Sequence, residues 1–192
     1  DLWHANDATI IEFTENGVSV PYIFVAAYSD KKINSIVKLR FNSLGEYWET
    51  ARYNFPEGFE FVSIACISNA RNESAVFLIK SGNNFHTVTI PNNLSSGTTL
   101  TPSLKFSIKT VDGFSSQGTH YDLSSDTLYI AFSSKTNFNE NCIKSYTGIL
   151  NASGTIPSSS TWTIKKGENT DLRFEVEGIG FRPNSDDDKL WF

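Results

Sequence analysis

The feature that most constrains the fold is a repeat of about 52 to 57 residues, in which short apolar runs recur in the same order. The first runs of the successive repeats are residues 8–13, 62–67, 119–123 and 176–181, and the second runs are residues 22–29, 75–81, 127–134 and 189–192. Self-similarity at such a period is typical of solenoids, propellers and other repeat architectures. The sequence therefore predicts several copies of one small structural unit.

The first three repeats continue in the same way after the second run. A third run ends near an Asn and a Gly, which are Asn42 and Gly45, Asn93 and Gly97, and Asn151 and Gly154. A fourth run follows, and it carries Trp48 in the first repeat and Trp162 in the third, whereas residues 104–111 fill this place without a Trp. Because glycine adopts positive φ without steric cost, we expect a tight hairpin between the third and fourth runs.

Helical periodicity is nearly absent from the chain. Apolar residues alternate or form runs of strand length, and clusters of Ser, Asn, Gly and Pro separate them. Candidate turns include Glu15-Asn16-Gly17, Ser81-Gly82-Asn83-Asn84 and Ser124-Ser125-Asp126. The sequence therefore predicts an all-β fold.

Four short strands with a turn at a fixed place resemble one blade of a β-propeller. The resemblance covers most of the chain and is one of architecture. It implies a single all-β domain over residues 1–192, with about three and a half four-stranded blades. The alternative is a two-sheet β-sandwich built from the same strands, for which the repeat would be a coincidence.

Propellers typically close with four to eight blades, so about three and a half leave an open edge. Residues Leu2–His4 could supply a closing strand to the last blade. Alternatively, a second polypeptide, either another copy or the remainder of a cleaved precursor, could carry the missing blades and make the domain part of a larger propeller. We favour the second polypeptide, because the sequence contains no Met and so looks like an excised piece.

The balance of charge excludes some classes of partner. The net charge is −5, and the Lys and Arg residues form no basic stripe, so we expect no nucleic-acid partner. No apolar stretch approaches the roughly 18 residues of a membrane-spanning helix, so we expect no membrane span.

Two features bear on the compartment. Three N-glycosylation motifs begin at Asn72, Asn93 and Asn151 and fall in expected loops or turns. Together with the missing Met, they favour a secreted, extracellular glycoprotein. The two cysteines, Cys66 and Cys142, could form one disulfide or remain two thiols, and the sequence leaves both alternatives open.

No motif points to a metal, a cofactor or a catalytic nucleophile. The three histidines lack metal-ligand spacing, the acidic triplet 186–188 lacks a calcium-loop pattern, and no G-x-S-x-G motif is present. We therefore expect no metal, no cofactor and no catalytic residue. The alternative is a glycoside hydrolase, which would need a pair of catalytic carboxylates. The candidates, chosen because they lie near the first or second run of a repeat, are Glu12, Asp30, Asp122, Asp126 and Glu177.

The aromatic residues give the most specific functional hypothesis. A Trp or Tyr ring can stack on the apolar face of a sugar while polar neighbours bind its hydroxyls. Trp48 and Trp162 occupy matching places in two repeats, although a Trp at the start of an outer strand also commonly packs between neighbouring blades. Secondary candidates are Tyr47, Tyr28 and Asp30.

The favoured hypothesis is a secreted, non-enzymatic, lectin-like propeller module that binds glycan or glycoprotein. The alternatives are a part of a glycoside-processing propeller enzyme and a non-catalytic scaffold for protein interaction or adhesion.

Overall fold

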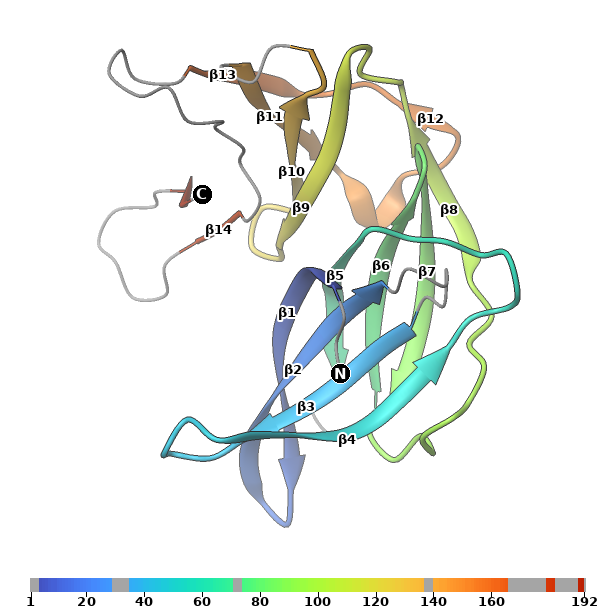
Figure 1. Ribbon diagram of the computed structural model, residues 1–192, viewed down its shortest axis with the longest axis vertical. Coiled ribbons are helices and arrows are strands. Elements are labelled where there is room, and N and C mark those ends of the chain that lie inside the picture. The colour runs from blue at the N-terminus through green and yellow to red at the C-terminus, as the bar shows by residue number, and fades with distance from the viewer. Residues whose placement is uncertain are drawn as a thin grey trace. The chain divides into compact units, whose positions relative to one another are not determined.

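The protein is all-β, and the prediction of that fold class is confirmed (Figure 1). The computed structural model describes residues 4–28, 35–70, 74–136, 140–165, 179–181 and 190–191. The chain forms two compact units, which comprise Asp1–Phe106 and Ser107–Phe192.

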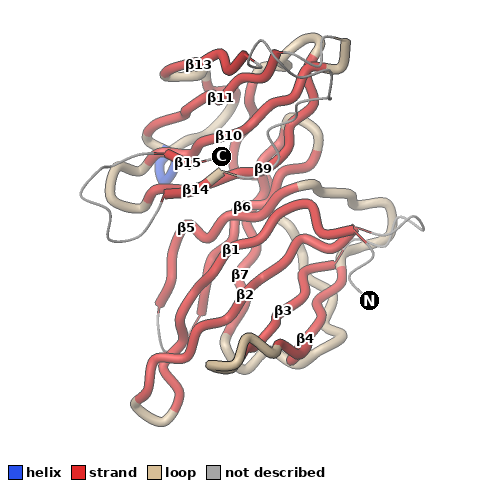
Figure 2. Tube along the Cα trace, turned by 60° about the vertical axis from the view of Figure 1, so that its left-hand side comes forward, coloured by secondary structure: helices blue, strands red, loops and turns tan. Residues whose placement is uncertain are grey.

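The first sheet contains the four strands of the first repeat. They are β1 (His4–Glu15), β2 (Val18–Tyr28), β3 (Ser35–Phe41) and β4 (Tyr47–Asn54), and they lie side by side in chain order (Figure 2). All neighbours are antiparallel. Asn16 and Gly17 form the turn between β1 and β2, and both have positive φ, as a two-residue hairpin turn requires.

The second sheet contains the strands of the second repeat. They are β5 (Ser63–Ala70), β6 (Ser74–Ser81), β7 (Asn84–Pro91) and β8 (Ser103–Ile108), again in chain order. Strand β8 runs across the boundary between the two units. Its last residues, Ser107 and Ile108, pair in parallel with the short strand β12 (Thr155–Ile156).

The third sheet repeats the arrangement in the second unit. Strands β9 (Phe114–Asp122), β10 (Thr127–Ser134), β11 (Glu140–Thr147) and β13 (Ser160–Lys165) are antiparallel neighbours in that order. A 3-10 turn, η1 (Ile149–Asn151), follows β11. Strands β14 (Gly180–Phe181) and β15 (Leu190–Trp191) pair where the first two runs of a fourth repeat are expected.

The predicted pattern of four runs per repeat is therefore confirmed for three repeats, but the predicted hairpin is not. A tight turn joins the third and fourth strands only in the first repeat, at residues 42–46. In the later repeats, residues 92–102 and 148–159 form longer connections. Gly97 and Gly154 keep the expected positive φ, yet each lies in a segment that pairs with the preceding repeat. A left-handed glycine suits both conformations, so it could not distinguish them.

A single apolar core joins the first two sheets. Buried side chains from β1 to β4 pack against buried side chains from β5 to β7. The Phe24 and Phe77 rings meet across this layer with their centroids 4.7 Å apart, and Phe13 packs edge-on against Phe24. The first two sheets of unit 1 therefore pack face to face.

The other face of the first sheet is also buried, but only along its central strands, β2 and β3. A second apolar cluster contains Val25, Ala27, Val37 and Leu39, each no more than 7% exposed. These residues alternate along β2 and β3 with those that face the first core, so both faces of the central strands exclude water. This explains why the two strands read as nearly continuous apolar runs.

Replacing Phe24 by Ala tests the importance of the core between the first two sheets. The ring is fully buried, so we expect the free energy of unfolding to fall by about 3–5 kcal/mol. Urea denaturation of both proteins measures the difference. Ile10→Ala is the control, because Ile10 lies on β1 and is 64% exposed, and it should change stability by less than about 0.5 kcal/mol. Equal losses from the two substitutions would contradict this account of the core.

Candidate functional site

Trp48 belongs to a row of side chains that crosses the first sheet. Its cross-strand partner is Arg40 on β3, and the partner of Arg40 on β2 is Tyr22. Cross-strand partners share a face of the sheet, so the three side chains form one row, here called the Trp48 row. Tyr22 is buried, whereas Trp48 is 45% exposed. The row therefore runs from the core to the surface.

Glu15 adds a carboxylate to the buried end of this row. The Tyr22 hydroxyl donates a 2.5 Å hydrogen bond to Glu15 Oε1, and Arg40 Nη1 lies 3.6 Å from Glu15 Oε2. The Arg40 guanidinium also lies over the Tyr22 ring, with Cζ 6.0 Å from the centroid. Burial, followed by the hydrogen bond and the charge of Glu15, raises the pKa of Tyr22 to about 12. Tyr22 therefore stays a neutral hydrogen-bond donor near pH 7.

A buried lysine lies next to the row. Lys38 Nζ donates to the carbonyl and to the side-chain oxygen of Asn92, at 3.1 and 2.9 Å. The ammonium also lies 4.1 Å from the centroid of Tyr22 and 5.0 Å from that of Phe13. Burial lowers the pKa of Lys38, and the charge of Glu15 opposes this shift. Because the aromatic faces and the Asn92 oxygens partly replace water, the cation is tolerated at this depth.

Tyr47 is separated from Trp48 by the geometry of the strand. Tyr47 pairs with Phe41 and is 68% exposed, and successive residues of a strand point to opposite faces. Just before it, Asn42 shapes the hairpin by accepting the N–H groups of Leu44 and Glu46 and donating to the Glu46 carboxylate. The structure therefore does not bring the two predicted aromatic ligands of this hairpin together.

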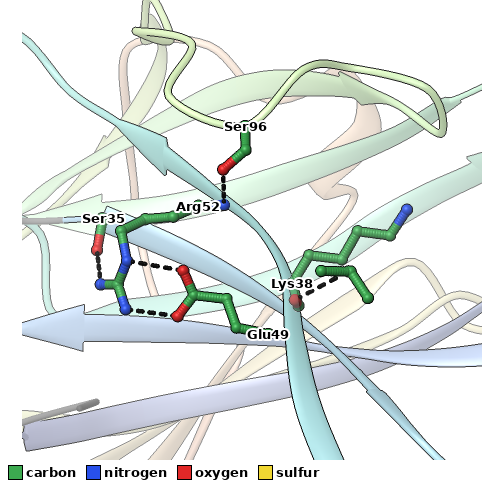
Figure 3. Close-up of polar contacts among 6 residues, drawn as sticks. Ser35, Lys38, Glu49, Arg52 and Ser96 are labelled. Carbon is green, nitrogen blue, oxygen red and sulfur yellow. Dashed lines mark hydrogen bonds and ion pairs between the residues drawn. The ribbon is translucent and has the colours of Figure 1, made fainter.

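The face of β4 opposite to Trp48 carries a closed polar network (Figure 3). Arg52 makes a two-pronged contact with Glu49, with Nη2 2.7 Å and Nε 3.1 Å from its carboxylate oxygens. Arg52 Nη1 also donates to Ser35 at 3.0 Å. A bulge at Thr50, whose hydroxyl donates to the Lys38 carbonyl, puts Arg52 and Glu49 on this same face. Each of the three guanidinium nitrogens of Arg52 thus already donates a hydrogen bond within the protein.

Trp162 lies on the equivalent strand of the third sheet but in a different row, which passes through Ile143 of β11 to Ala131 of β10. It lies on the fourth strand, β13, and is 46% exposed. Its ring is tilted by 30° against the Tyr129 ring, with the centroids 6.2 Å apart. His120 is the cross-strand partner of Tyr129, and burial lowers the pKa of His120. Trp162 therefore also belongs to an aromatic surface.

The remaining predicted residues are dispersed. Tyr28 ends β2, where its backbone pairs with His4. Asp30 and Asn72 lie outside the described residues. Asn93 and Asn151 are both exposed, in a turn after β7 and in η1 respectively.

Both cysteines are free thiols in the structure, so the alternative of a disulfide is not formed. Cys142 is buried, and Cys66 is partly buried. Burial raises the pKa of the Cys66 thiol to about 11, so this thiol is protonated near pH 7.

Two carboxylates proposed from the sequence for catalysis shape one turn of the third sheet. Asp122 accepts hydrogen bonds from the backbone and hydroxyl of Ser124 and from the hydroxyl of Ser125. Asp126 accepts from the Tyr121 hydroxyl at 2.8 Å and from the Leu150 amide at 3.0 Å. These bonds fix the turn between β9 and β10 and tie it to η1.

Sequence reasoning missed the polar members of the site, which are Glu15, Tyr22, Lys38, Arg40 and Asn92. One signal was present: Lys38 and Arg40 interrupt the otherwise apolar run of β3. Two cations on one face of a buried strand require partners, which here come from three other segments. The partners depend on strand register, which the sequence does not state.

No protein-family model matches the sequence, and no curated protein matches it significantly. In the part of the chain that the structure describes, no helix has the length and apolar character needed to cross a membrane.

Glu15→Gln tests the coupling between Glu15 and Tyr22. Loss of the carboxylate charge should lower the Tyr22 pKa from about 12 towards the ordinary 10.0, though not fully, because burial is the largest cause of the shift. Absorbance titration near 295 nm follows the phenolate, and subtracting the Tyr22→Phe curve isolates this tyrosine. An unchanged titration midpoint of Tyr22 in Glu15→Gln would contradict the hydrogen bond between the Tyr22 hydroxyl and the Glu15 carboxylate.

The same shift makes stability depend on pH. The folded pKa of about 12 lies above the ordinary 10.0, so the neutral phenol stabilises the fold fully below about pH 10. This contribution is lost as the pH rises towards 12. The stability difference between the natural protein and Tyr22→Phe should therefore shrink over that interval, as measured by urea denaturation at each pH. A constant difference would contradict the raised pKa.

Proposed function

We propose that this protein is a secreted, lectin-like module that binds glycans through the exposed tryptophans of its fourth strands. The observation that carries the proposal is the recurrence of a half-exposed tryptophan, Trp48 and then Trp162, on two fourth strands. They lie on the fourth strands of the first and third sheets, and they are 45% and 46% exposed. A tryptophan that only packed between sheets would be expected to bury most of its ring.

The surroundings of Trp48 fit a sugar. The indole offers a flat apolar face for the C–H face of a pyranose, and Arg40 lies beside it with its side chain 40% exposed. Arg40 makes no guanidinium hydrogen bond to another described residue, so its donors can reach sugar hydroxyls. Glu15, with its side chain 30% exposed, offers acceptor oxygens next to them. A flat apolar surface with a few placed polar groups is typical of ligand sites.

Repetition supports binding through several sites. Two similar aromatic surfaces on one chain allow weak individual affinities to combine into avidity for a multivalent glycan. The burial of both faces of β2 and β3 supports stacking of further sheets, as in a propeller, because an isolated two-sheet sandwich would leave one face of each sheet in water. A second polypeptide that completes such a stack is part of this proposal.

Trp48→Ala and Trp162→Ala test the proposal. Each substitution should weaken glycan binding at its own site by about 2 kcal/mol, or roughly thirtyfold, because a central stacking surface is lost. A glycan array identifies ligands, and titration with the selected glycan measures affinity. Either substitution alone should abolish agglutination of glycan-coated beads, since cross-linking needs at least two sites.

Tyr47→Ala is the matched control for Trp48→Ala. Tyr47 is the adjacent residue and is more exposed, but it lies on the opposite face of β4. Its loss should leave binding unchanged. Equal losses of glycan affinity from the two substitutions would show that they act by disturbing the hairpin and not by removing a contact with the glycan. Failure of the natural protein to bind any glycan would refute the proposed function.

Glycosylation tests the proposed secreted location. Asn93 and Asn151 are exposed in turns, so both should carry N-glycans when the protein passes through a eukaryotic secretory pathway. Peptide mapping before and after enzymatic removal of N-glycans measures occupancy, and Asn93→Gln and Asn151→Gln should each remove one glycan. Unmodified asparagines in fully secreted material would contradict this prediction.

A further inference from the structure

Two connections in the chain pair with the fourth strand of the preceding repeat. Between β7 and β8, Gly97 and Leu100 donate backbone hydrogen bonds to Arg52 and Asn54 of β4, at 2.7 and 2.8 Å. The Asn54 amide donates in return to Thr98 at 2.9 Å, and Asn54 pairs in parallel with Thr99. This segment continues the first sheet beyond β4.

The second connection does the same one repeat later. Between β11 and β13, Thr155 and Ile156 pair in parallel with Ser107 and Ile108 of β8. The Ser107 amide donates to the Gly154 carbonyl at 2.7 Å. The second and third repeats therefore each send one extended segment back to the outer edge of the previous repeat.

The two segments share a sequence. The first segment reads Ser96-Gly97-Thr98-Thr99-Leu100, and Pro102 follows after one further residue. The second segment reads Ser153-Gly154-Thr155-Ile156, and Pro157 follows directly. We call each of them a latch, defined as residues 96–102 and 153–157. The glycine has positive φ in both, +86° and +64°, and Leu100 is buried in the core of the first two sheets. The latch sequence thus combines a turn, a short pairing strand and an apolar anchor.

The fourth strand of the third repeat, β13, has an outer edge that no described strand covers. Among the described residues, β13 pairs with β11 on one side only. The tripeptide Ser-Gly-Thr occurs twice in the sequence, and both copies are already paired. An open edge of this kind is available for strand addition.

We propose that the outer edge of β13 binds a latch supplied by a further repeat that lies outside residues 1–192. The occupant is an extended segment of the Ser-Gly-Thr-Leu/Ile-Pro type, added in parallel as in the two internal cases. Main-chain hydrogen bonds provide the attachment, and the Leu or Ile side chain provides the apolar anchor. Both latches within residues 1–192 are already paired, so the occupant belongs to a further repeat of this type.

The test uses a synthetic peptide of residues 94–102 and isotope-labelled protein. Nuclear magnetic resonance titration should show saturable shifts of the β13 amides at residues 161–164. Two modified peptides provide a matched comparison. N-methylation at Leu100 removes a pairing donor and should weaken binding by about tenfold or more, whereas N-methylation at Thr99, whose amide takes no part in the pairing with β4, should retain binding.

Several outcomes would overturn the proposal. No shifts at millimolar peptide, or equal loss of affinity from both methylated peptides, would show that β13 does not accept a latch. Shifts confined to β4 or β8 would mean that the peptide only displaces an internal latch. Concentration-dependent dimers that protect β13 without peptide would identify a second copy as the occupant. None of these results depends on glycan binding.

Discussion

Sheet edges are the constraint on which the rest of the structure depends. Each antiparallel sheet of four strands has two outer rows of backbone N–H and C=O groups that require partners. The latches supply partners at the outer edges of β4 and β8. At the opposite edges, the Ile64 amide donates to Asp7, and the Asn69 side chain donates to the Glu12 carbonyl, so β1 and β5 lie side by side. Successive repeats are thus linked by hydrogen bonds as well as by the apolar core.

Burial on both faces of the central strands has a second consequence. Polar side chains on such strands either find partners inside the protein or lie near the end of the sheet where water returns. Lys38 finds partners inside the protein, which are Asn92 and two aromatic rings. Arg40 lies near the end of the sheet, where its side chain is partly exposed to water. The Trp48 row lies at this transition, so it offers both a rigid aromatic surface and accessible hydrogen-bond donors. Arg52 lies on β4, as Trp48 does, but on the opposite face, and its guanidinium instead donates hydrogen bonds to Glu49 and Ser35.

Much of the fold could be predicted from the sequence, because alternation and turn chemistry are local properties. The run at residues 127–134 coincides with β10, and the Asn16-Gly17 turn adopts the expected conformation. The hairpins expected at Gly97 and Gly154 were wrong, since the partner of each segment lies in the preceding repeat. For the site, Trp48 and Trp162 were identifiable from their repeated position. Their neighbours were not, because Arg40 and Tyr22 become adjacent only through the pairing of different strands.

The sequence by itself determined that the chain forms strands, how many strands each repeat contains and where tryptophans recur. These properties follow from residue type and spacing along the chain. Only the tertiary structure decided which strand edges are covered and which face of its sheet each aromatic ring occupies. The physical reason is that edge pairing joins residues of different repeats, such as Asn54 and Thr99, and that a bulge such as the one at Thr50 changes which side chains share a face.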